Sequence, residues 1–517
     1  MLATLPNFLG GRWQAGHGSG TPLVDPVLGT ELVRVDAGGL DLEAGFAYAR
    51  DEGGAALRAL TYRQRGQLLA EVVKLLQSNR DAYYEIATAN SGTVKNDSAV
   101  DIDGAIFTLG HYAKLGDTLG DTRLLRDGEP VRLGKDPLFQ SQHVLTPTRG
   151  VALFINAFNF PAWGLWEKAG PALLSGVPVI VKPATATAWL TQRMVRDVID
   201  AGVLPAGALS IVCGSSAGLM DALQPFDVVS FTGSAETAAV IRSHPAVAQR
   251  SVRANIEADS LNAALLLPDA QRGGEAFNLL VREVVREMTV KSGQKCTAIR
   301  RVFVPANLFD AAAEAISAKL SGITVGNPRN ETVRMGSLVS RAQLNAVAEG
   351  LGLLRQEAAV IHDGTSHALV DADTSVSACI GPTLLGVRDA DQASRVHSVE
   401  VFGPVATLVP YRSLEHAVDL VRRGQGSLVT SLYGGEPLAL AHASAELAST
   451  QGRVHVVSPD VATLHTGHGN VMPMSLHGGP GRAGGGEELG GHRALGFYHR
   501  RTAIQASRAV LDALPAA

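Results

Sequence analysis

The chain has 517 residues, 46% of them hydrophobic and 18% charged, which is enough for two or three domains with buried cores. Its formal net charge of -4 lacks the basic excess that wholesale nucleic-acid binding needs, so no nucleic-acid partner is expected. No run of 18 or more apolar residues appears, which predicts no membrane span. The start, MLATLPNFLGGRWQ, lacks the regions of a signal peptide. Three cysteines without a C-x-x-C spacing indicate the reducing cytoplasm and no disulfide framework.

Residues 1–125 are predicted to be mostly helical after a short hairpin-like start. Thr61 and Gln64 stand three positions apart before QLLAEVVKLL, a pattern that predicts a capping box opening an amphipathic helix. Residues 126–145 are polar and alternating, with two prolines. They predict an extended excursion outside the core.

From residue 150, short apolar runs alternate with helical stretches, and a second pattern of this kind starts near residue 256. The runs are residues 151–155, 177–181, 209–213 and 228–232. Runs of this kind predict an α/β fold with a parallel sheet covered on both faces, whose ligands bind beyond the carboxyl ends of the strands. The tail, residues 480–504, is glycine-rich and then alternating, and predicts a mobile loop that leads to an edge strand.

Cys296 lies in the polar turn SGQKC between two apolar runs. A free cysteine is usually a small buried hydrophobe, and that interpretation suits Cys213 and Cys379. For Cys296 a nucleophile is an equal alternative, because Gly293 lets backbone approach a ligand closely. Such a thiol needs activation by helix amides, a cation or a base.

Polar residues at strand ends offer further chemistry, each with a plainer alternative. Glu257 is either a salt-bridged strand end or a general base whose burial raises its pKa. Asn156 and Asn159 either donate to an oxyanion or simply favour a turn. Lys182 is either solvated or meets a ribose or phosphate.

Three histidines, His465, His468 and His477, lie in the glycine-rich region ATLHTGHGNVMPMSLHGG. A metal site is conceivable there. The preferred interpretation is that they line a substrate entrance or cap turns, and no metal is expected.

Taken in order, these motifs resemble those of the aldehyde dehydrogenase superfamily over residues 5–510. NFLGGRW is similar to its N-terminal hairpin, NAFNFPAW to its asparagine loop, and VIVKPATAT and FTGSAE to its cofactor loops. GQKC is similar to its nucleophile turn, and EVFGPV and GGGEELG to later active-site segments. The resemblance implies two Rossmann-like parallel-sheet domains plus a β oligomerisation arm. The implied division is 1–125, 146–255 and 467–482 for the NADP-binding domain, 256–466 for the catalytic domain, and 126–145 and 483–517 for the arm.

The resemblance also implies roles for individual residues. Cys296 is the expected nucleophile, Glu257 the base, and Asn159 the oxyanion donor together with the Cys296 backbone amide. Lys168 and Glu488 are the expected proton relay, with the adjacent Glu487 as the alternative to Glu488. The implied cofactor contacts are Ile155, Asn156, Lys182, Ala184, Thr185, Ser215, Thr232, Gly233, Ser234, Ala258, Glu400 and Phe402.

Departures from the family pattern bear on the cofactor. Thr185 stands where the family has a glutamate that binds the ribose hydroxyls of NAD, and losing that carboxylate removes repulsion against a 2′-phosphate. NADP is therefore expected, with NAD weaker. Where the family has Leu-Gly-Gly after the base, this chain has residues 258–260, Ala-Asp-Ser.

Residues 155–190 resemble the branch of the family that oxidises CoA-linked semialdehydes from aromatic ring cleavage. One type in that branch carries a fused hydratase domain, and the chain's end just after the dehydrogenase tail favours the stand-alone benzoate-pathway type. The expected substrate is thus a CoA-linked semialdehyde, oxidised to the acid by a cytoplasmic homodimer. A general aldehyde dehydrogenase, a CoA-acylating one, the phenylacetate-pathway counterpart and a non-catalytic relative are the alternatives. The presence of Glu257 favours hydrolysis over CoA attack, and the intact set of site residues favours an enzyme.

Overall fold

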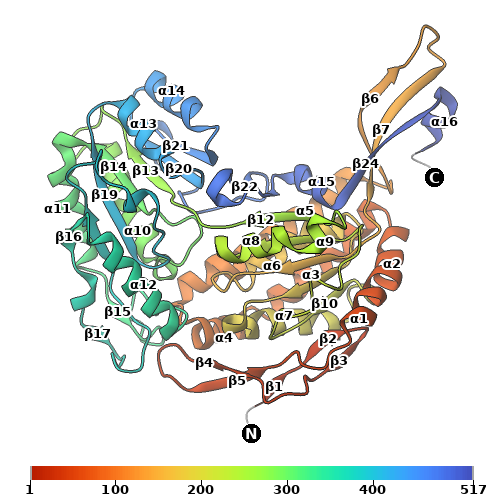
Figure 1. The fold of residues 1–517 in the computed structure, drawn as a ribbon, viewed down its shortest axis with the longest axis horizontal. Coiled ribbons are helices and arrows are strands. Elements are labelled where there is room, and N and C mark those ends of the chain that lie inside the picture. Colours follow the sequence, from red (N-terminus) through yellow and green to blue (C-terminus); the bar gives the residue numbers. More distant parts are fainter. Residues whose placement is uncertain (1–2, 515–517) are drawn as a thin grey trace.

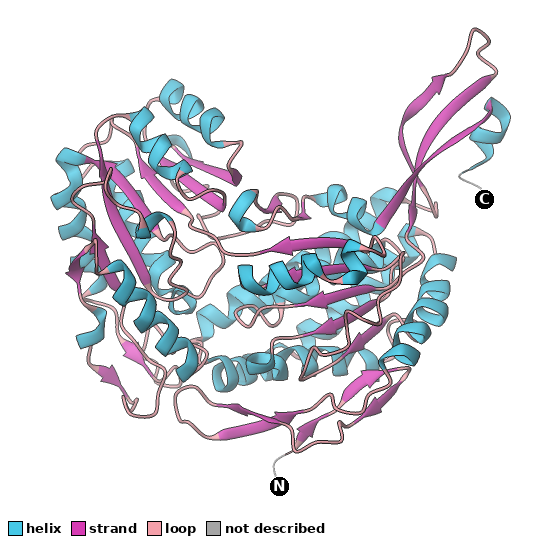
Figure 2. Cartoon of the chain, in the orientation of Figure 1, coloured by secondary structure: helices cyan, strands magenta, loops and turns pink. Residues whose placement is uncertain are grey.

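Two large sheets, each flanked by helices, and a projecting three-stranded arm make up the structure, a computed structural model that describes residues 3–514. Figure 2 shows the mixture of helices and strands throughout the body. In Figure 1 the arm projects at the upper right, and α16 (Arg508–Ala513) lies beside it. No helix within residues 3–514 is long and apolar enough to cross a membrane. The architecture is the α/β class that the sequence predicts.

The first sheet has the order β12-β11-β8-β9-β10-β2-β3. Its strands are β2 (Asn7–Leu9), β3 (Arg12–Gln14), β8 (Ala152–Ile155), β9 (Val179–Lys182), β10 (Leu209–Ile211), β11 (Val228–Thr232) and β12 (Arg253–Glu257). The last five run parallel, and the four predicted apolar runs supply β8 to β11. The predicted N-terminal hairpin is confirmed as β2–β3, and it extends the sheet antiparallel to β10.

Helices cover this sheet on both sides. Those of the N-terminal half are α1 (Leu42–Tyr48), α2 (Gly54–Ala59), α3 (Tyr62–Ser78), α4 (Arg80–Ile86), α5 (Lys95–Leu119), α6 (Trp163–Leu174), α7 (Ala188–Asp200), α8 (Ala235–Ser243) and α9 (Pro245–Ala248). The capping box is confirmed: the Thr61 side chain accepts from the Gln64 backbone N–H, and the Gln64 side chain accepts from the Thr61 backbone. A small sheet of β1 (Thr4–Leu5), β5 (Glu31–Val35) and β4 (Thr21–Val24) also lies in this half, where the sequence predicts mainly helix.

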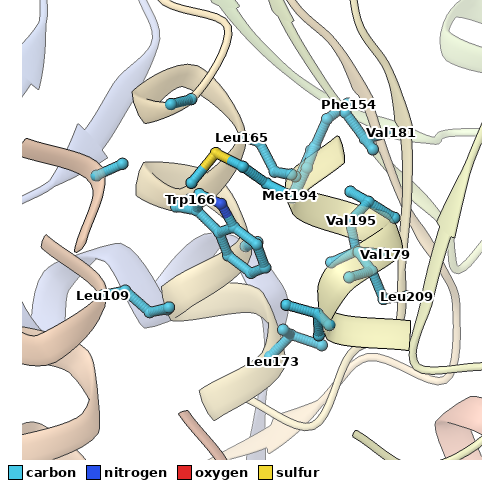
Figure 3. Close-up of a cluster of buried hydrophobic side chains, with 14 of the residues drawn as sticks. Leu109, Phe154, Leu165, Trp166, Leu173, Val179, Val181, Met194, Val195 and Leu209 are labelled. Carbon is cyan, nitrogen blue, oxygen red and sulfur yellow. The ribbon is translucent and has the colours of Figure 1, made fainter. Parts of the chain in front are cut away.

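Helix α6 is buried along its whole length, because α5 packs on it from one side and the first sheet from the other. Trp166 is fully buried, and Figure 3 shows its indole among side chains of the sheet and of α7, including Phe154 and Met194. This packing fixes α6, which also carries the buried charged pair Glu167 and Lys168. The core therefore holds charged groups of the site in place.

The second sheet has the order β16-β18-β19-β14-β13-β20-β21 and is parallel except for β16. Its strands are β13 (Ala263–Leu266), β14 (Arg301–Pro305), β16 (Ala359–His362), β18 (Thr383–Gly386), β19 (Val405–Tyr411), β20 (Ser427–Tyr433) and β21 (Gln451–Val457). Its helices are α10 (Glu275–Thr289), α11 (Phe309–Leu320), α12 (Arg341–Leu354), α13 (Leu414–Arg422) and α14 (Pro437–Leu447). A short pair, β15 (Val325–Gly326) and β17 (Leu369–Val370), lies apart from it.

The C-terminal tail packs against the first sheet and α6 before it reaches the arm. β22 (Leu476–Gly478) pairs antiparallel with β23 (Glu487–Leu489), and α15 (Leu495–Tyr498) follows. The arm consists of β6 (Leu125–Arg132), β7 (Phe139–Pro147) and β24 (His499–Ser507), and α16 (Arg508–Ala513) ends it. The extended excursion and the terminal edge strand are thus confirmed as parts of one sheet. The glycine-rich segment that precedes β24 is predicted from the sequence as a loop. It is folded as the β22–β23 hairpin and short helical turns.

Candidate active site

Cys296 lies in the turn between α10 and β14. The backbone just before it is left-handed at three consecutive residues, Lys291 (φ 53), Ser292 (φ 54) and Gly293 (φ 68). A Cβ on Gly293 would lie 2.3 Å from the carbonyl oxygen of Gly403. Glycine is therefore needed here for a close approach to protein backbone, whereas the sequence predicts an approach to a ligand.

Hydrogen bonds hold this turn on both sides of the cysteine. The Asn262 side-chain amide donates to the carbonyl oxygens of Cys296 (2.7 Å) and Ala298 (3.0 Å). The backbone N–H of Lys291 donates to the buried carboxylate of Asp97 at 2.8 Å. Cys296 is partly exposed, whereas Cys213 and Cys379 are buried. Burial raises the pKa of Cys213 to about 12 and that of Cys379 to about 11, so both have the environment of inert packing cysteines.

Two cavities meet at Cys296. One, of about 530 Å³, lies beyond the carboxyl ends of the first sheet and is also lined by Gln343, Glu400 and Phe402 from the part of the chain that forms the second sheet. The other, of about 300 Å³, is lined by apolar side chains such as Phe160, Trp163 and Val471, with Arg286 and Asp103 among its charged groups. Of the described residues 3–514, only Cys296 lines both cavities. A molecule in either cavity can therefore reach the sulfur.

The larger cavity gathers most of the predicted cofactor contacts. Of the twelve, Ser215 does not line it, and the neighbouring Ser216 does. The Ser215 hydroxyl instead accepts from the backbone N–H of Ala217 at 3.1 Å. The residues that do line it are Ile155, Asn156, Lys182, Ala184, Thr185, Thr232, Gly233, Ser234, Ala258, Glu400 and Phe402.

Several groups in this cavity suit a nicotinamide dinucleotide. Among residues 3–514, the buried side-chain oxygen Asn156 Oδ1 has no hydrogen-bond partner, so it is free to meet a ligand. Glu400 Oε1 accepts no hydrogen bond from these residues either, but it lies 3.6 Å from Arg300 Nε. Lys182 lies at the end of β9, and burial lowers the pKa of its ammonium. Thr185 lies in the next turn, where its hydroxyl donates to the Gly214 carbonyl oxygen at 3.4 Å. That turn carries no carboxylate.

Glu400 is half-buried, and it lines the larger cavity together with Phe402. It accepts a hydrogen bond from the Ser260 backbone at 3.0 Å, and the Arg300 guanidinium is 3.6 Å away. Burial raises the pKa of its carboxyl to about 7, although Arg300 and the Ser260 N–H act against the shift. Asp259, one of the three residues that replace the family's Leu-Gly-Gly, has a structural role. Its carboxylate accepts a hydrogen bond from the backbone N–H of Ala235 at the start of α8.

Glu257 ends β12 and is only 2% exposed. Burial by itself favours the neutral acid, but His477 Nε2 lies 2.8 Å from Glu257 Oε2 and the Lys168 ammonium is also nearby. These neighbours outweigh burial and hold the pKa of the Glu257 carboxyl below its ordinary value. The expected raised pKa is therefore wrong, and Glu257 is ionised at neutral pH.

Cys296 has the opposite environment. Burial, followed by the carboxylates of Glu257 and Glu167, raises the pKa of its thiol well above the ordinary value. The nearest nitrogen base is His477, whose Nε2 lies 4.0 Å from Sγ. The thiol is thus protonated at rest and needs a base to become a nucleophile.

The predicted relay pair is brought together behind Glu257. Lys168 Nζ lies 3.5 Å from Glu488 Oε1 and 3.1 Å from Glu167 Oε1, and it donates to the Thr232 hydroxyl at 2.9 Å. Glu488 also accepts from the Ser230 hydroxyl at 2.7 Å. It is buried, whereas Glu487 on the other face of β23 is exposed, so the geometry favours Glu488.

Asn159 lies in the loop after β8 and lines the larger cavity together with Cys296. It is 8% exposed. A small void between the two cavities is lined by Asn159, Glu167, Glu257 and Cys296. This void has the composition expected for the place where an oxyanion and a water would lie.

The sequence analysis does not identify Glu167 as a site residue, although its position next to Lys168 is a usable signal. His477, expected to line a substrate entrance or to cap a turn, lines the smaller cavity, where it is 3% exposed beside Cys296 and Glu257. The ligand atoms of His477, Cys296 and Glu257 lie within 4.8 Å of one another, close enough to share a metal ion. The other two histidines form separate contacts, His465 with His455 and His468 with Ser431.

The fold and this site together define the class. Residues 13–504 match the model of the aldehyde dehydrogenase family, and the chain belongs to that family. It is an oxidoreductase of the aldehyde dehydrogenase type. Over 477 residues it is 56% identical to 3,4-dehydroadipyl-CoA semialdehyde dehydrogenase of Aromatoleum evansii, a match that covers 92% of this chain and 93% of that one.

Other comparisons agree with the fold. Protein MaoC of Klebsiella aerogenes is 40% identical over 179 residues, which are 34% of this chain and 52% of that one. A crystal structure of betaine aldehyde dehydrogenase from Staphylococcus aureus superimposes with a TM-score of 0.83 at 21% identity, covering 97% of this chain and 95% of that one. Another structure of that enzyme, in complex with NAD+, has the same TM-score at 21% identity and covers 97% and 96%.

Proposed function

We propose that this chain oxidises 3,4-dehydroadipyl-CoA semialdehyde, or a close CoA-linked homologue, to the carboxylic acid with NADP, as a step of aerobic benzoate catabolism. The observation that carries the proposal is the position of Cys296, which lines both cavities. Hydride transfer needs the aldehyde carbon, once it is bonded to the sulfur, to face the nicotinamide, and a sulfur that borders both cavities allows this. The 56% identity to the Aromatoleum evansii enzyme supports the substrate class.

In this mechanism the Cys296 sulfur, once deprotonated, attacks the aldehyde carbon and forms a thiohemiacetal. The Asn159 side-chain amide and the Cys296 backbone N–H donate to the resulting oxyanion, and one such donor typically contributes about 10²–10³ in rate. The nicotinamide, when bound, supplies the hydride acceptor. Loss of hydride from the carbon leaves a thioester on Cys296.

Hydrolysis of the thioester uses Glu257, which is ionised and lies behind the sulfur. Its carboxylate takes a proton from water, the hydroxyl attacks the acyl carbon, and the C–S bond breaks to release the acid. Lys168 and Glu488 then pass the proton from Glu257 toward solvent. The presence of this base favours hydrolysis over attack by a second CoA.

The cofactor preference follows from the Thr185 turn. A carboxylate there would repel a 2′-phosphate, whereas the uncharged Thr185 side chain does not. The variant Thr185→Glu is expected to lower kcat/KM with NADP by about tenfold or more and to spare the reaction with NAD. Equal loss with both cofactors would contradict the assignment of Thr185 to the ribose.

A homodimer in the cytoplasm is part of the same proposal, and the arm supports the dimer. The tip of the β6–β7 hairpin exposes Val131, Leu133, Leu138 and Phe139, each at least 46% exposed. Apolar side chains and free strand edges of this kind are normally covered by another chain.

The test is the initial rate of reduced nicotinamide formation with a C6 CoA semialdehyde, its longer homologue and a free aliphatic aldehyde. We expect a large advantage for the C6 CoA semialdehyde with NADP, and no turnover by Cys296→Ala, which still binds cofactor. Full activity of Cys296→Ala would refute the mechanism. Equal rates on the free aldehyde would refute the substrate assignment, and a rate that depends on added CoA would favour an acyl-CoA product.

A further inference from the structure

The turn that carries Cys296 and the loop that carries Asn159 are both tied to helix α5. This helix has two buried carboxylates, Asp97 and Asp101, which are 5% and 2% exposed. They stand one helical turn apart, so they lie on the same face of the helix. The mechanism above gives neither of them a role.

Asp97 holds the nucleophile turn, residues 290–296. Its Oδ2 accepts a hydrogen bond from the backbone N–H of Lys291 at 2.8 Å. Lys291 and Ser292 have the left-handed φ values 53 and 54, a conformation that residues with a side chain keep only where neighbouring contacts impose it. The Ser292 hydroxyl supplies a second tie, because it donates to the Gly336 carbonyl oxygen at 3.0 Å. The hydrogen bond to Asp97 therefore helps to fix the path of the chain toward the sulfur.

Asp101 holds the oxyanion loop, residues 156–162. Its Oδ1 accepts from the backbone N–H of Trp163 at 2.7 Å, and its Oδ2 accepts from that of Ala162 at 3.3 Å. These two N–H groups open α6, so the carboxylate caps that helix from a neighbouring element. The end of the loop that carries Asn159 is thereby fixed on α5.

The Lys291 side chain connects the two attachments. Its ammonium lies 3.9 Å from Asp101 Oδ2 and 4.5 Å from the centroid of the ring of Phe160, the residue that follows Asn159. Lys291 is 4% exposed, and a cation that is buried so far from water needs such partners. Lys291 thus contacts Asp97 through its backbone and the oxyanion loop through its side chain.

This connection bears on the reaction because the oxyanion is held by groups from both segments. In the proposed mechanism Asn159 donates from one segment and the Cys296 backbone N–H donates from the other, and both residues line the same small void. Such donors act only at hydrogen-bond distance from the oxyanion. A misplacement of about 1 Å can cost about 10² in rate.

We propose that Asp97 and Lys291 are positioning residues, which set the Cys296 sulfur against the Asn159 amide by way of α5. This inference rests on the proposed function, because it takes the roles of Cys296 and Asn159 from it. Asp97 and Lys291 act through the two loops. Replacing either is therefore expected to slow the chemical step and to leave KM and cofactor affinity within about twofold of the wild type.

The test is a double-mutant cycle between Asp97→Ala and Asn159→Ala. The readout is the single-turnover formation of reduced nicotinamide, with the best substrate of the panel above at saturation. Burial raises the pKa of the Asp97 carboxyl to about 6, so the assay is run at pH 8, where the carboxylate is ionised.

The expected result is a strongly non-additive cycle. Asn159→Ala by itself is expected to slow the step about 10²–10³-fold. Asp97→Ala is expected to slow it about tenfold or more in the wild-type background, but less than about threefold in the Asn159→Ala background, because an absent donor cannot be misplaced. A contact that serves stability alone would give the same factor in both backgrounds.

Three variants complete the design. Asp97→Asn keeps an oxygen that can accept from the Lys291 N–H, and it is expected to stay within about threefold of the wild type. Asp117→Asn changes an exposed carboxylate on the same helix and is expected to behave as the wild type. Lys291→Met removes the ammonium from Asp101 and Phe160, and it is expected to repeat the coupling with Asn159→Ala. It supplies the cycle if thermal unfolding and cofactor binding show that Asp97→Ala does not fold.

An additive cycle would overturn the proposal, namely one in which Asp97→Ala or Lys291→Met costs the same factor with and without the Asn159 amide. An unchanged single-turnover rate in Asp97→Ala, or a loss confined to KM or to cofactor affinity, would overturn it as well. Failure of the proposed function is a separate result, seen as full activity of Asn159→Ala or of Cys296→Ala.

Discussion

Replacing Glu400 with glutamine is expected to remove a pH dependence of cofactor binding that the structure builds into the site. Burial raises the pKa of the Glu400 carboxyl to about 7. Glu400 lines the cavity that we assign to the cofactor, and its Oε1, which lies 3.6 Å from Arg300 Nε, accepts no hydrogen bond from residues 3–514. If a ribose hydroxyl donates to this oxygen, the ionised form binds best. About nine-tenths of the carboxyl is ionised at pH 8 and about one-tenth at pH 6.

The affinity of the wild-type enzyme is therefore expected to fall about tenfold from pH 8 to pH 6. NAD is the better probe for this titration, because a 2′-phosphate itself ionises near pH 6. Glu400→Gln is expected to bind weakly and equally at both pH values. Glu349→Gln, which changes an exposed carboxylate on α12, is expected to behave as the wild type.

The raised pKa of Glu400 also makes folding stability depend on pH, in the opposite direction to cofactor binding. Because the pKa is higher in the folded state, the contribution of Glu400 to the free energy of unfolding is complete below about pH 4.5 and is lost as the pH rises toward about 7. The loss is at most about 3 kcal/mol, and Glu400→Gln abolishes it. Fluorescence titration of NAD and thermal unfolding at pH 6 and pH 8 give both readouts. A wild-type affinity that does not change with pH, or a tenfold change that persists in Glu400→Gln, would refute the reasoning.

Two further variants test the supports of the site. Gly293→Ala places a Cβ 2.3 Å from the Gly403 carbonyl oxygen, at a residue whose φ is 68. The variant is therefore expected to displace the Cys296 turn, to lose more than about 1 kcal/mol of stability and to lose most of its activity. A melting temperature and an activity equal to those of the wild type would contradict this. Lys168→Met leaves the buried carboxylates of Glu167 and Glu488 without their cation, a change that typically costs about 3–5 kcal/mol, and unfolding is expected to show a larger loss at pH 8 than at pH 5 because buried carboxylates resist ionisation. A loss that is the same at both pH values would show that the lysine acts through packing alone.

Local chemistry in the sequence was sufficient for much of the fold. The apolar runs at 151–155 and 228–232 became adjacent parallel strands, because a buried strand must be apolar on both faces. The Thr61 capping box formed because its contacts lie within one helical turn. The polar, glycine-containing flank of Cys296 likewise distinguished it from the two buried cysteines. The small β1-β5-β4 sheet escaped prediction, since its pairings join segments without a strong local pattern.

The electrostatics of the site were decided only by tertiary structure. The pKa of Glu257 lies below its ordinary value because His477 and Lys168 reach it from β22 and α6, far away in the sequence. The choice of Glu488 over Glu487 depended on which face of β23 turned toward Lys168. A sequence shows which groups can ionise, but the free energy of each charge depends on burial and on neighbours that only the folded chain brings within a few ångströms.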